Sequence, residues 1–374
     1  MKLLVLDVES TISNKGNPFD QTNKLVCISW WWDGEAHAEQ CSEDLYKYIQ
    51  GLIDEADLII GFNFKFDGHW LRRVGIRWEH KRIFDTQLAE FVITRQSEKY
   101  PSLEGCCIKY NLGHKLDIIK SEYWNKGIDT DQIPWPILQE YAALDAALTY
   151  ALYQKQVTLF NKAQLQLLNL QFQDEIILAE MEWNGLPYNE TLCKERSDEL
   201  NHQARQIEDQ LKNVYPDIPI NFGSPDQLSS FLYGGTIEQV TKVHSGFYKT
   251  GIKAGQPKYT NETIVHNLPR LYEPDKRAKL AKEGKYSTSE DYLLKLKGDK
   301  KIIGMLLELS KIQKLLGTYY DGLPKKNAEK HWKPGFLHGQ FNQCVAATGR
   351  LSSSEPNLQN MASDLLDIFP TRFK

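Results

Sequence analysis

The fold of the first part of this chain is decided by the stretch Leu3-Leu4-Val5-Leu6-Asp7-Val8-Glu9. Its hydrophobicity is nearly continuous up to Val8, which is typical of a central strand that is buried on both faces. The run ends on two carboxylates, which are costly to bury unless a cation pairs with them. Because Asp7 and Glu9 are two residues apart on a strand, their side chains point to the same face. The stretch therefore predicts a central strand with a cation site at its end.

The residues that follow predict an α/β domain. We expect strands over Leu25–Trp32 and Leu58–Phe62, and helices over Ser42–Ile53, Gly68–Val74 and Ile137–Leu159. Strands that come first and then alternate with helices indicate one mixed sheet flanked by helices. This first domain is predicted to occupy residues 1–155.

The second part of the chain changes character. Phe160–Trp183 and Glu190–Val214 are long helical patterns, separated by a stop at Asn184-Gly185-Leu186-Pro187. We therefore predict a mainly helical region over residues 156–334. The polar segment 335–374 has no clean helical period and is predicted to be a third part.

Composition sets broad limits on the class of protein. The 374 residues are 41% hydrophobic and 25% charged, as in soluble globular proteins. The net charge is −4, so the chain as a whole does not have the basic charge that is typical of nucleic-acid binding. No run of ~20 apolar residues occurs that could span a bilayer, and no signal peptide precedes the first strand. Six cysteines without a C-x-x-C pair are interpreted as reduced thiols. We expect an intracellular, cytoplasmic protein with no membrane partner.

Two further acidic residues end or follow apolar patterns. Asp67 closes the run that begins at Leu58, and Asp145 lies four residues after Tyr141, on the same face of a predicted helix. If these elements meet, four carboxylates and a phenol form one cluster. Oxygen ligands suit hard divalent cations, and a pair of Mg²⁺ or Mn²⁺ ions is the arrangement used for phosphodiester cleavage. The Tyr141 phenol is placed to orient the attacking water.

Each of these motifs alone is common in proteins without a metal, and the argument rests on their order and context. Together, Asp7-x-Glu9, Asn63-x-x-x-Asp67 and Tyr141-x-x-x-Asp145 resemble the three motifs of the DEDD exonuclease superfamily in its tyrosine-bearing form. Lys115-Leu116-Asp117 and Tyr123-Trp124 are similar to the proofreading domain of family A DNA polymerases.

This resemblance implies a ribonuclease-H-like fold that removes nucleotides from the 3′ end of single-stranded DNA. It implies that two divalent cations are held by Asp7, Glu9, Asp67 and Asp145. It also implies that Tyr141 positions the water and that Asn63 contacts DNA.

The polar stretch Thr348–Asn360 resembles the segment that leads into the palm of family A DNA polymerases, bacteriophage enzymes included. By that match Arg350 contacts the primer terminus. The resemblance also implies contacts to the primer-template for Thr348, Asn357, Gln359 and Asn360. Donors of this kind suit the acceptors that base pairs show in the minor groove.

Residues 236–286 look like an insertion in the helical region, which resembles the polymerase thumb. Basic residues outnumber acidic ones there by ten to five, and aromatic residues are interleaved with them. This composition suits a surface that meets a phosphate backbone, and it also suits a solvated loop. Some bacteriophage relatives bind a processivity factor at a thumb insertion, so such a partner is a further expectation.

The polymerising motifs of the family do not occur in these 374 residues. We therefore expect the exonuclease and thumb part of a split, bacteriophage-type family A DNA polymerase, with a second chain supplying the fingers and most of the palm. Two alternatives stay open at this point. One is a non-catalytic DNA-binding scaffold, and the other is a stand-alone 3′-5′ exoribonuclease.

Overall fold

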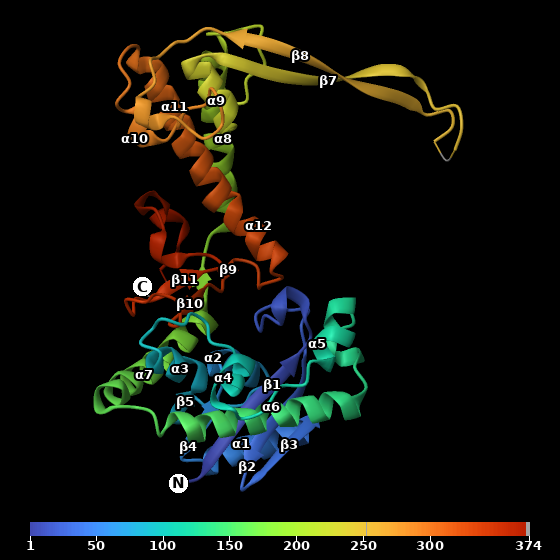
Figure 1. The fold of residues 1–374 in the computed structure, drawn as a ribbon, viewed down its shortest axis with the longest axis vertical. Coiled ribbons are helices and arrows are strands. Elements are labelled where there is room, and N and C mark those ends of the chain that lie inside the picture. The colour runs from blue at the N-terminus through green and yellow to red at the C-terminus, as the bar shows by residue number, and fades with distance from the viewer. Residues whose placement is uncertain (252, 372–374) are drawn as a thin grey trace. The chain divides into compact units, whose positions relative to one another are not determined.

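The computed structural model describes residues 1–251 and 253–371, which form two compact units (Figure 1). Unit 1 comprises Met1–Glu190 together with Leu323–Lys374, and unit 2 comprises Thr191–Gly322. The division into functional domains at residues 1–155, 156–334 and 335–374 follows other boundaries and stays a prediction. No helix among the described residues is long and apolar enough to cross a membrane.

Unit 1 is built on a five-stranded mixed sheet in the order β3-β2-β1-β4-β5. The central strand β1 pairs antiparallel with β2 and parallel with β4, and β4 pairs parallel with β5. The strand bounds are β1 Leu3–Ser10, β2 Leu25–Trp32, β3 Glu35–Gln40, β4 Leu58–Gly61 and β5 Ile83–Asp85. The predicted mixed sheet, with the acidic stretch on its central strand, is confirmed.

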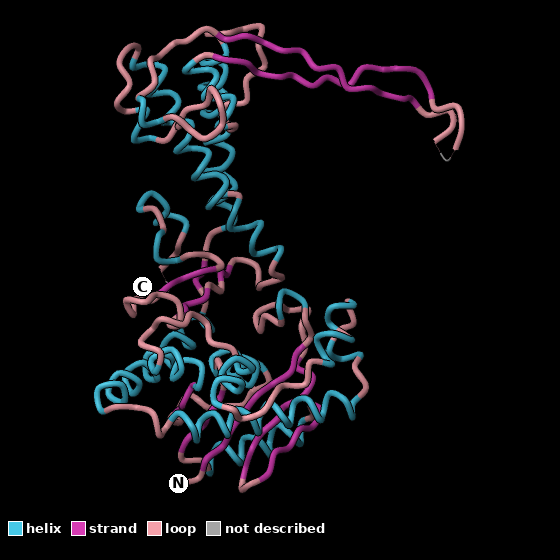
Figure 2. The backbone as a smooth tube through the Cα atoms, in the orientation of Figure 1, coloured by secondary structure: helices cyan, strands magenta, loops and turns pink. Residues whose placement is uncertain are grey.

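Helices pack around this sheet and close its core (Figure 2). They are α1 Glu43–Glu55, α2 Phe64–Arg73, α3 Thr86–Ile93, α4 Leu103–Tyr110, α5 Ile118–Glu122, α6 Trp135–Gln156 and α7 Lys162–Asn184. Helix α6 packs across β1, β2 and β3, and α2 packs against β1. Leu4, Leu6, Ile28 and Ile59 of the strands are fully buried. Helices α2 and α6, which both contact β1, therefore carry the remaining predicted acidic residues.

Helix α2 begins earlier than the sequence predicts. It starts at Phe64 rather than Gly68, so Asp67 lies in its first turn and does not end a strand. The Asp85 carboxylate causes this early start, because it accepts hydrogen bonds from the backbone amides of Asn63 (3.2 Å) and Phe64 (2.7 Å). A capping group from another strand satisfies the free amides of a helix start but leaves no signal in the local sequence.

The later segments of unit 1 form short strands and turns. The bounds are β6 Leu186–Pro187, β9 Phe336–Leu337, β10 Gln340–Asn342 and β11 Ser352–Ser354, with α12 spanning Gly322–Glu329. Strand β6 pairs with β9, and β10 pairs with β11. Short 3-10 turns lie at Ser13–Lys15, Trp124–Lys126, Thr130–Gln132, Lys276–Ala278, Leu358–Asn360 and Ser363–Ile368, the fourth of them in unit 2.

Unit 2 has a helical core, as predicted. Its helices are α8 Glu190–Lys212, α9 Pro225–Tyr233, α10 Glu290–Leu293 and α11 Lys300–Leu315, which continues as a π-helix over Leu316–Tyr320. Leu211, Phe231 and Leu232 are fully buried between them.

A two-stranded ribbon in unit 2 was not expected from the sequence. Strands β7 (Gly235–Phe247) and β8 (Pro257–Leu268) pair antiparallel within the predicted insertion. The sequence analysis set this stretch apart as an insertion in the mainly helical region and assigned it no strands. Its side chains are exposed on both faces over most of its length, so no burial pattern with a period of two marks the strands.

Substitution of Gly68 in α2 tests how tightly this helix packs beside Asp67. A Cβ atom there would lie 2.5 Å from Cζ2 of Trp78, whose Nε1 donates to the Gly68 carbonyl at 2.8 Å. We expect Gly68→Ala to lower the free energy of unfolding by about 1–3 kcal/mol through overpacking. All nine tryptophans lie in unit 1, so denaturant unfolding followed by tryptophan fluorescence reports on this unit.

Gly51→Ala is the matched control for this substitution. Gly51 lies within α1 with open space around it, so alanine is expected to stabilise the helix by about 0.5–1 kcal/mol. Equal effects of the two substitutions would contradict the packing argument.

Candidate active site

Three of the predicted acidic side chains converge in unit 1. Asp7 and Glu9 project from β1, and Asp145 projects from α6. Each offers one ligand oxygen, and these oxygens all lie within 4.8 Å of one another. The period of the strand sets the first two on one face, and the packing of α6 across the sheet brings the third to them.

Asp67 lies close to this group from the first turn of α2. Its side chain is buried and accepts a hydrogen bond from the Val8 backbone amide. Burial raises the pKa of Asp67 well above its usual range, and the charges of Asp7 and Glu9 raise it further. The charges of the other acids therefore affect the pKa of Asp67, although Asp67 lies outside the group of three carboxylates that is defined by the 4.8 Å separation.

The electrostatics of the cluster favour a bound cation. Burial, followed by the charge of Asp145, raises the pKa of Asp7 to about 7. Burial and the charge of Asp7 raise the pKa of Glu9 well above its usual range. Within the described residues, Oδ1 of Asp145 is buried and lacks a hydrogen-bond partner. Carboxylates this close repel one another, and a divalent cation with oxygen ligands would relieve that repulsion, so these residues fit such an ion.

Tyr141 stands one helical turn before Asp145. The two side chains are hydrogen-bonded, and the Tyr141 ring meets Trp124 edge-on with the centroids 6.2 Å apart. Burial raises the pKa of the Tyr141 phenol far above its usual value, and the charge of Glu9 adds to the shift. Tyr141 therefore keeps its proton at neutral pH and can donate a hydrogen bond.

Lys115 is a site residue for which the sequence analysis assigned no role. Its Nζ lies 2.5 Å from Oδ2 of Asp145 and 5.2 Å from the Tyr141 ring centroid. Its backbone amide donates to Oε2 of Glu104 at 2.6 Å, which fixes the loop. Lys115 lies in an irregular segment, so no periodicity could place its side chain.

Ser29 is a second residue that the sequence analysis missed. It lies opposite Asp7 in the β1–β2 register, and its Oγ donates to Oδ2 of Asp7 at 3.3 Å. Only knowledge of the strand pairing could have identified this contact.

Glu182 of α7 forms a buried hub beside α2. Its side chain is 3% exposed. Oε1 accepts from Lys65 Nζ and from the Phe341 amide, both at 2.6 Å, and Oε2 lies 2.9 Å from His69 Nε2. Burial alone would raise the pKa of Glu182, but the hydrogen bonds and charges of His69 and Lys65 lower it below its usual value. Glu182 thus joins α2 to strand β10.

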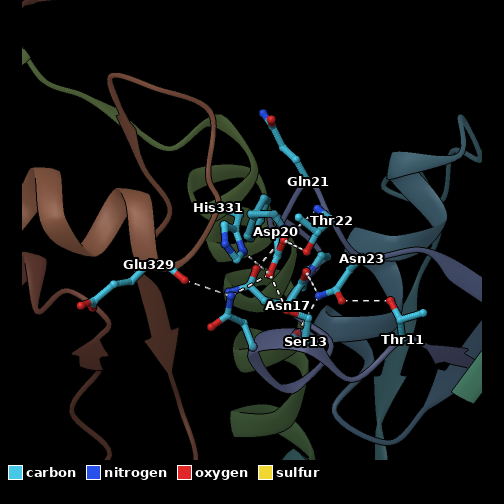
Figure 3. A network of polar contacts seen from close by, with 12 residues as sticks. Thr11, Ser13, Asn17, Asp20, Gln21, Thr22, Asn23, Glu329 and His331 are labelled. Atoms are coloured by element: carbon cyan, nitrogen blue, oxygen red, sulfur yellow. Dashed lines mark hydrogen bonds and ion pairs between the residues drawn. The ribbon is translucent and has the colours of Figure 1, made fainter. Parts of the chain in front are cut away.

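Asp20 forms a second buried anchor, between the β1–β2 loop and the segment after α12 (Figure 3). Its carboxylate accepts from Asn14 Nδ2 at 2.7 Å and Thr22 Oγ1 at 2.6 Å, and it lies 3.3 Å from His331 Nδ1. Burial opposes ionisation, but these donors lower the pKa of Asp20 to about 2. The carboxylate therefore stays charged and fully bonded at neutral pH.

The predicted DNA-contacting residues are not members of the group formed by Asp7, Glu9 and Asp145. Asn63 is exposed at the start of α2. The others are exposed in the last described segment of unit 1, namely Thr348, Arg350, Asn357, Gln359 and Asn360. Asn357 caps a short turn by accepting from the Gln359 amide at 3.1 Å. Exposure leaves these donors accessible to a ligand.

Comparison with protein families identifies two matched segments. Residues 13–158 match the 3′-5′ exonuclease family, and residues 257–367 match DNA polymerase family A. The first match contains Asp67, Tyr141 and Asp145 but begins after Asp7 and Glu9.

The curated relatives are bacterial enzymes. The chain is 30% identical to DNA polymerase I of Synechocystis sp. over 306 residues, which cover 80% of this chain and 26% of that protein. It is 29% identical to DNA polymerase I of Bacillus subtilis over 77% of this chain and 28% of that protein. The chain thus spans less than a third of the length of these relatives. The sequence analysis expected a bacteriophage-type enzyme, whereas these two relatives are bacterial enzymes.

A solved structure confirms the fold. The POL domain of Pol1 from M. smegmatis, in complex with DNA primer-template and dNTP, superposes with a TM-score of 0.64 at 22% identity. The likeness covers 98% of this chain and 54% of that one.

The buried contacts of Glu182 predict that its removal lowers the free energy of unfolding. Glu182→Ala leaves the half-buried Lys65 and the buried His69 without their acidic partner, so we expect a loss of about 3–5 kcal/mol of unfolding free energy. The control is Glu122→Ala, which breaks an exposed pair with Lys126 and is expected to cost less than about 1 kcal/mol. Denaturant unfolding of unit 1 measures both, and similar losses would refute the role of the hub.

Proposed function

We propose that this chain hydrolyses the 3′-terminal phosphodiester bond of single-stranded DNA, because residues 13–158 match the 3′-5′ exonuclease family and residues 257–367 match DNA polymerase family A. The observation that carries the proposal is the convergence of the half-buried Asp7 and Glu9 with the buried Asp145 in one group. A cluster of carboxylates with raised pKa values is suited to hard cations and to phosphate chemistry.

In this proposal Asp7, Glu9, Asp67 and Asp145 hold two divalent cations, Mg²⁺ or Mn²⁺. When bound, such a pair of ions supplies an activated water and stabilises the charge on the leaving 3′-oxygen. The four side chains come from β1, α2 and α6, so the packing of three elements sets the geometry of the site.

The protein's own groups orient the reactants. Tyr141 keeps its proton, which it donates to Asp145, and its phenol oxygen orients the attacking water by accepting a hydrogen bond from it. Lys115 holds Asp145 by an ion pair and limits the rotation of its carboxylate. We assign Lys115 as a positioning residue.

We further propose that the exposed donors bind the DNA strand. Asn63 lies two residues from Lys65 at the start of α2, and the other five lie near the strands β10 and β11, namely Thr348, Arg350, Asn357, Gln359 and Asn360. Amide, hydroxyl and guanidinium donors suit phosphate oxygens and the acceptors of the minor groove.

The remaining expectations belong to the same proposal. They are the functional division into an exonuclease domain (1–155), a thumb region (156–334) and the start of a palm (335–374). A second polymerase chain, a processivity factor and a bacteriophage origin stay predictions.

Substitution of Asp7 tests the reaction. We expect Asp7→Ala to slow the shortening of 5′-labelled single-stranded DNA by at least about 100-fold, equivalent to ~2.7 kcal/mol of activation free energy. The matched control is Asp44→Ala, which removes an exposed carboxylate of α1 and should leave the rate unchanged. Products are resolved by gel electrophoresis in the presence of Mg²⁺.

The same assay separates the alternatives. A wild-type chain that binds DNA without shortening it would support a scaffold and contradict the nuclease. Faster shortening of an RNA strand than of DNA would indicate an exoribonuclease. Asp7→Ala removes a half-buried like charge, so its unfolding midpoint should not fall, and a lower midpoint would show that the variant is merely unstable.

The affinity for a divalent cation can be measured independently of nuclease activity. We expect the wild-type chain to bind Mn²⁺ and Asp145→Asn to bind it at least about tenfold more weakly, a change of ~1.4 kcal/mol. Asp44→Asn is the control and should bind Mn²⁺ as the wild type does. Electron paramagnetic resonance of free Mn²⁺ measures the affinities, and equal binding by all three chains would exclude Asp145 as a ligand.

A further inference from the structure

The β7–β8 ribbon of unit 2 extends beyond any core that could support it. Its strands pair from Gly235 with Leu268 to Phe247 with Pro257, and the ribbon projects from the helices of its own unit (Figure 1). Only its base is anchored, because Ile237 and Leu268 are buried in the helical core. An isolated two-stranded ribbon is marginally stable in water. A long exposed ribbon of this kind calls for a role outside the fold.

Charge is unevenly distributed along the ribbon. The distal half, residues 242–260, contains four lysines and no acidic residue: Lys242, Lys249, Lys253 and Lys258. Both acids of the two strands, Glu238 and Glu262, lie in the half nearer the helices. Within residues 1–251 and 253–371, no carboxylate pairs with any of these four lysines. The distal half is therefore a strongly basic element in a chain whose net charge is −4.

The same half exposes aromatic rings. Phe247 is 60% exposed and Tyr259 is 55% exposed. The His244 ring lies between them, 5.1 Å from Phe247 and 5.8 Å from Tyr259 by centroid. Lys242 shares the face of His244, since residues two apart on a strand point the same way. Aromatic faces and a lysine are thus presented together to the solvent.

We propose that the distal half of the β7–β8 ribbon binds the phosphodiester backbone of single-stranded nucleic acid, with Phe247 and Tyr259 stacking on unpaired bases. Lysines supply the attraction to phosphate, and exposed rings stack on any base whose face is free. The bases of a duplex are already stacked on one another, which favours a single strand. The cores of protein interfaces are depleted in lysine, which disfavours a protein partner.

The first test removes charge from the ribbon. The variant combines Lys249→Gln, Lys253→Gln and Lys258→Gln in the full chain. The matched control combines Lys47→Gln, Lys155→Gln and Lys162→Gln, which are exposed lysines of unit 1 and change the net charge equally. Fluorescence anisotropy with labelled oligothymidylate, in EDTA to prevent cleavage, gives the affinity at several salt concentrations.

Three lost phosphate contacts should flatten the plot of log affinity against log salt by about 2, at ~0.7 per contact for a single strand. The control should keep the wild-type slope. If the ribbon variant also keeps that slope, the proposal is overturned and a protein partner becomes the better explanation of the ribbon.

A second variant removes the distal ribbon without disturbing its base. Residues 240–263 are excised, and Gln239 is joined through Asn-Gly to Ile264, its partner across the ribbon. The anchors Ile237 and Leu268 stay in place, so the core of unit 2 should keep its helical circular dichroism. We expect a loss of salt dependence at least as large, because Lys242 is removed as well, and wild-type binding by this variant would overturn the proposal.

The aromatic residues test the preference for a single strand. Phe247→Ala combined with Tyr259→Ala should weaken binding to the single strand by about fivefold or more and leave duplex binding unchanged. No effect on the single strand, or equal effects on both, would overturn the assignment of stacking. A wild-type chain that fails to shorten DNA, but whose binding still depends on the lysines, would support this proposal while refuting the nuclease.

Discussion

The acidic site of unit 1 depends on the fixed position of two half-buried like charges on the central strand β1. Asp7 and Glu9 cannot leave the sheet, because β1 is paired on both sides and its apolar residues form the core. Their pKa values are raised by that burial, and Asp145 adds a third carboxyl within 4.8 Å. Burial and mutual repulsion disfavour the charged form of these carboxylates, so placing them together costs folding free energy. We interpret them as a preorganised set of oxygen ligands.

Two other buried carboxylates of the same unit show what a structural role looks like. Asp20 and Glu182 are surrounded by donors, and the pKa of each is lowered despite burial. Both link the exonuclease-like part to the segment that follows α12, through His331 and Phe341. Donors thus satisfy Asp20 and Glu182, which join parts of the fold, whereas burial and neighbouring carboxylates raise the pKa values of Asp7 and Glu9.

Helix α2 connects these two classes of carboxylate. Its first turn carries Asp67 toward the acidic group, while Lys65 and His69, one turn apart, meet Glu182. Asp85 caps the start of the same helix. The position of Asp67 is thus held from two sides by groups that belong to α7 and β5. The β7–β8 ribbon of unit 2 differs from this, because it is anchored only at its base and is exposed elsewhere.

Much of the acidic site follows from local periodicity in the sequence. A period of two places Asp7 and Glu9 on one face of a strand, and a spacing of four places Tyr141 and Asp145 on one face of a helix. Only the tertiary structure decided the start of α2, the contacts of Lys115 and Ser29 with the carboxylates, and the β7–β8 ribbon. These features arise from partners distant in sequence, or from strands whose exposed faces carry no alternating pattern. Periodicity records which face of an element is buried, but it does not record which other element meets that face.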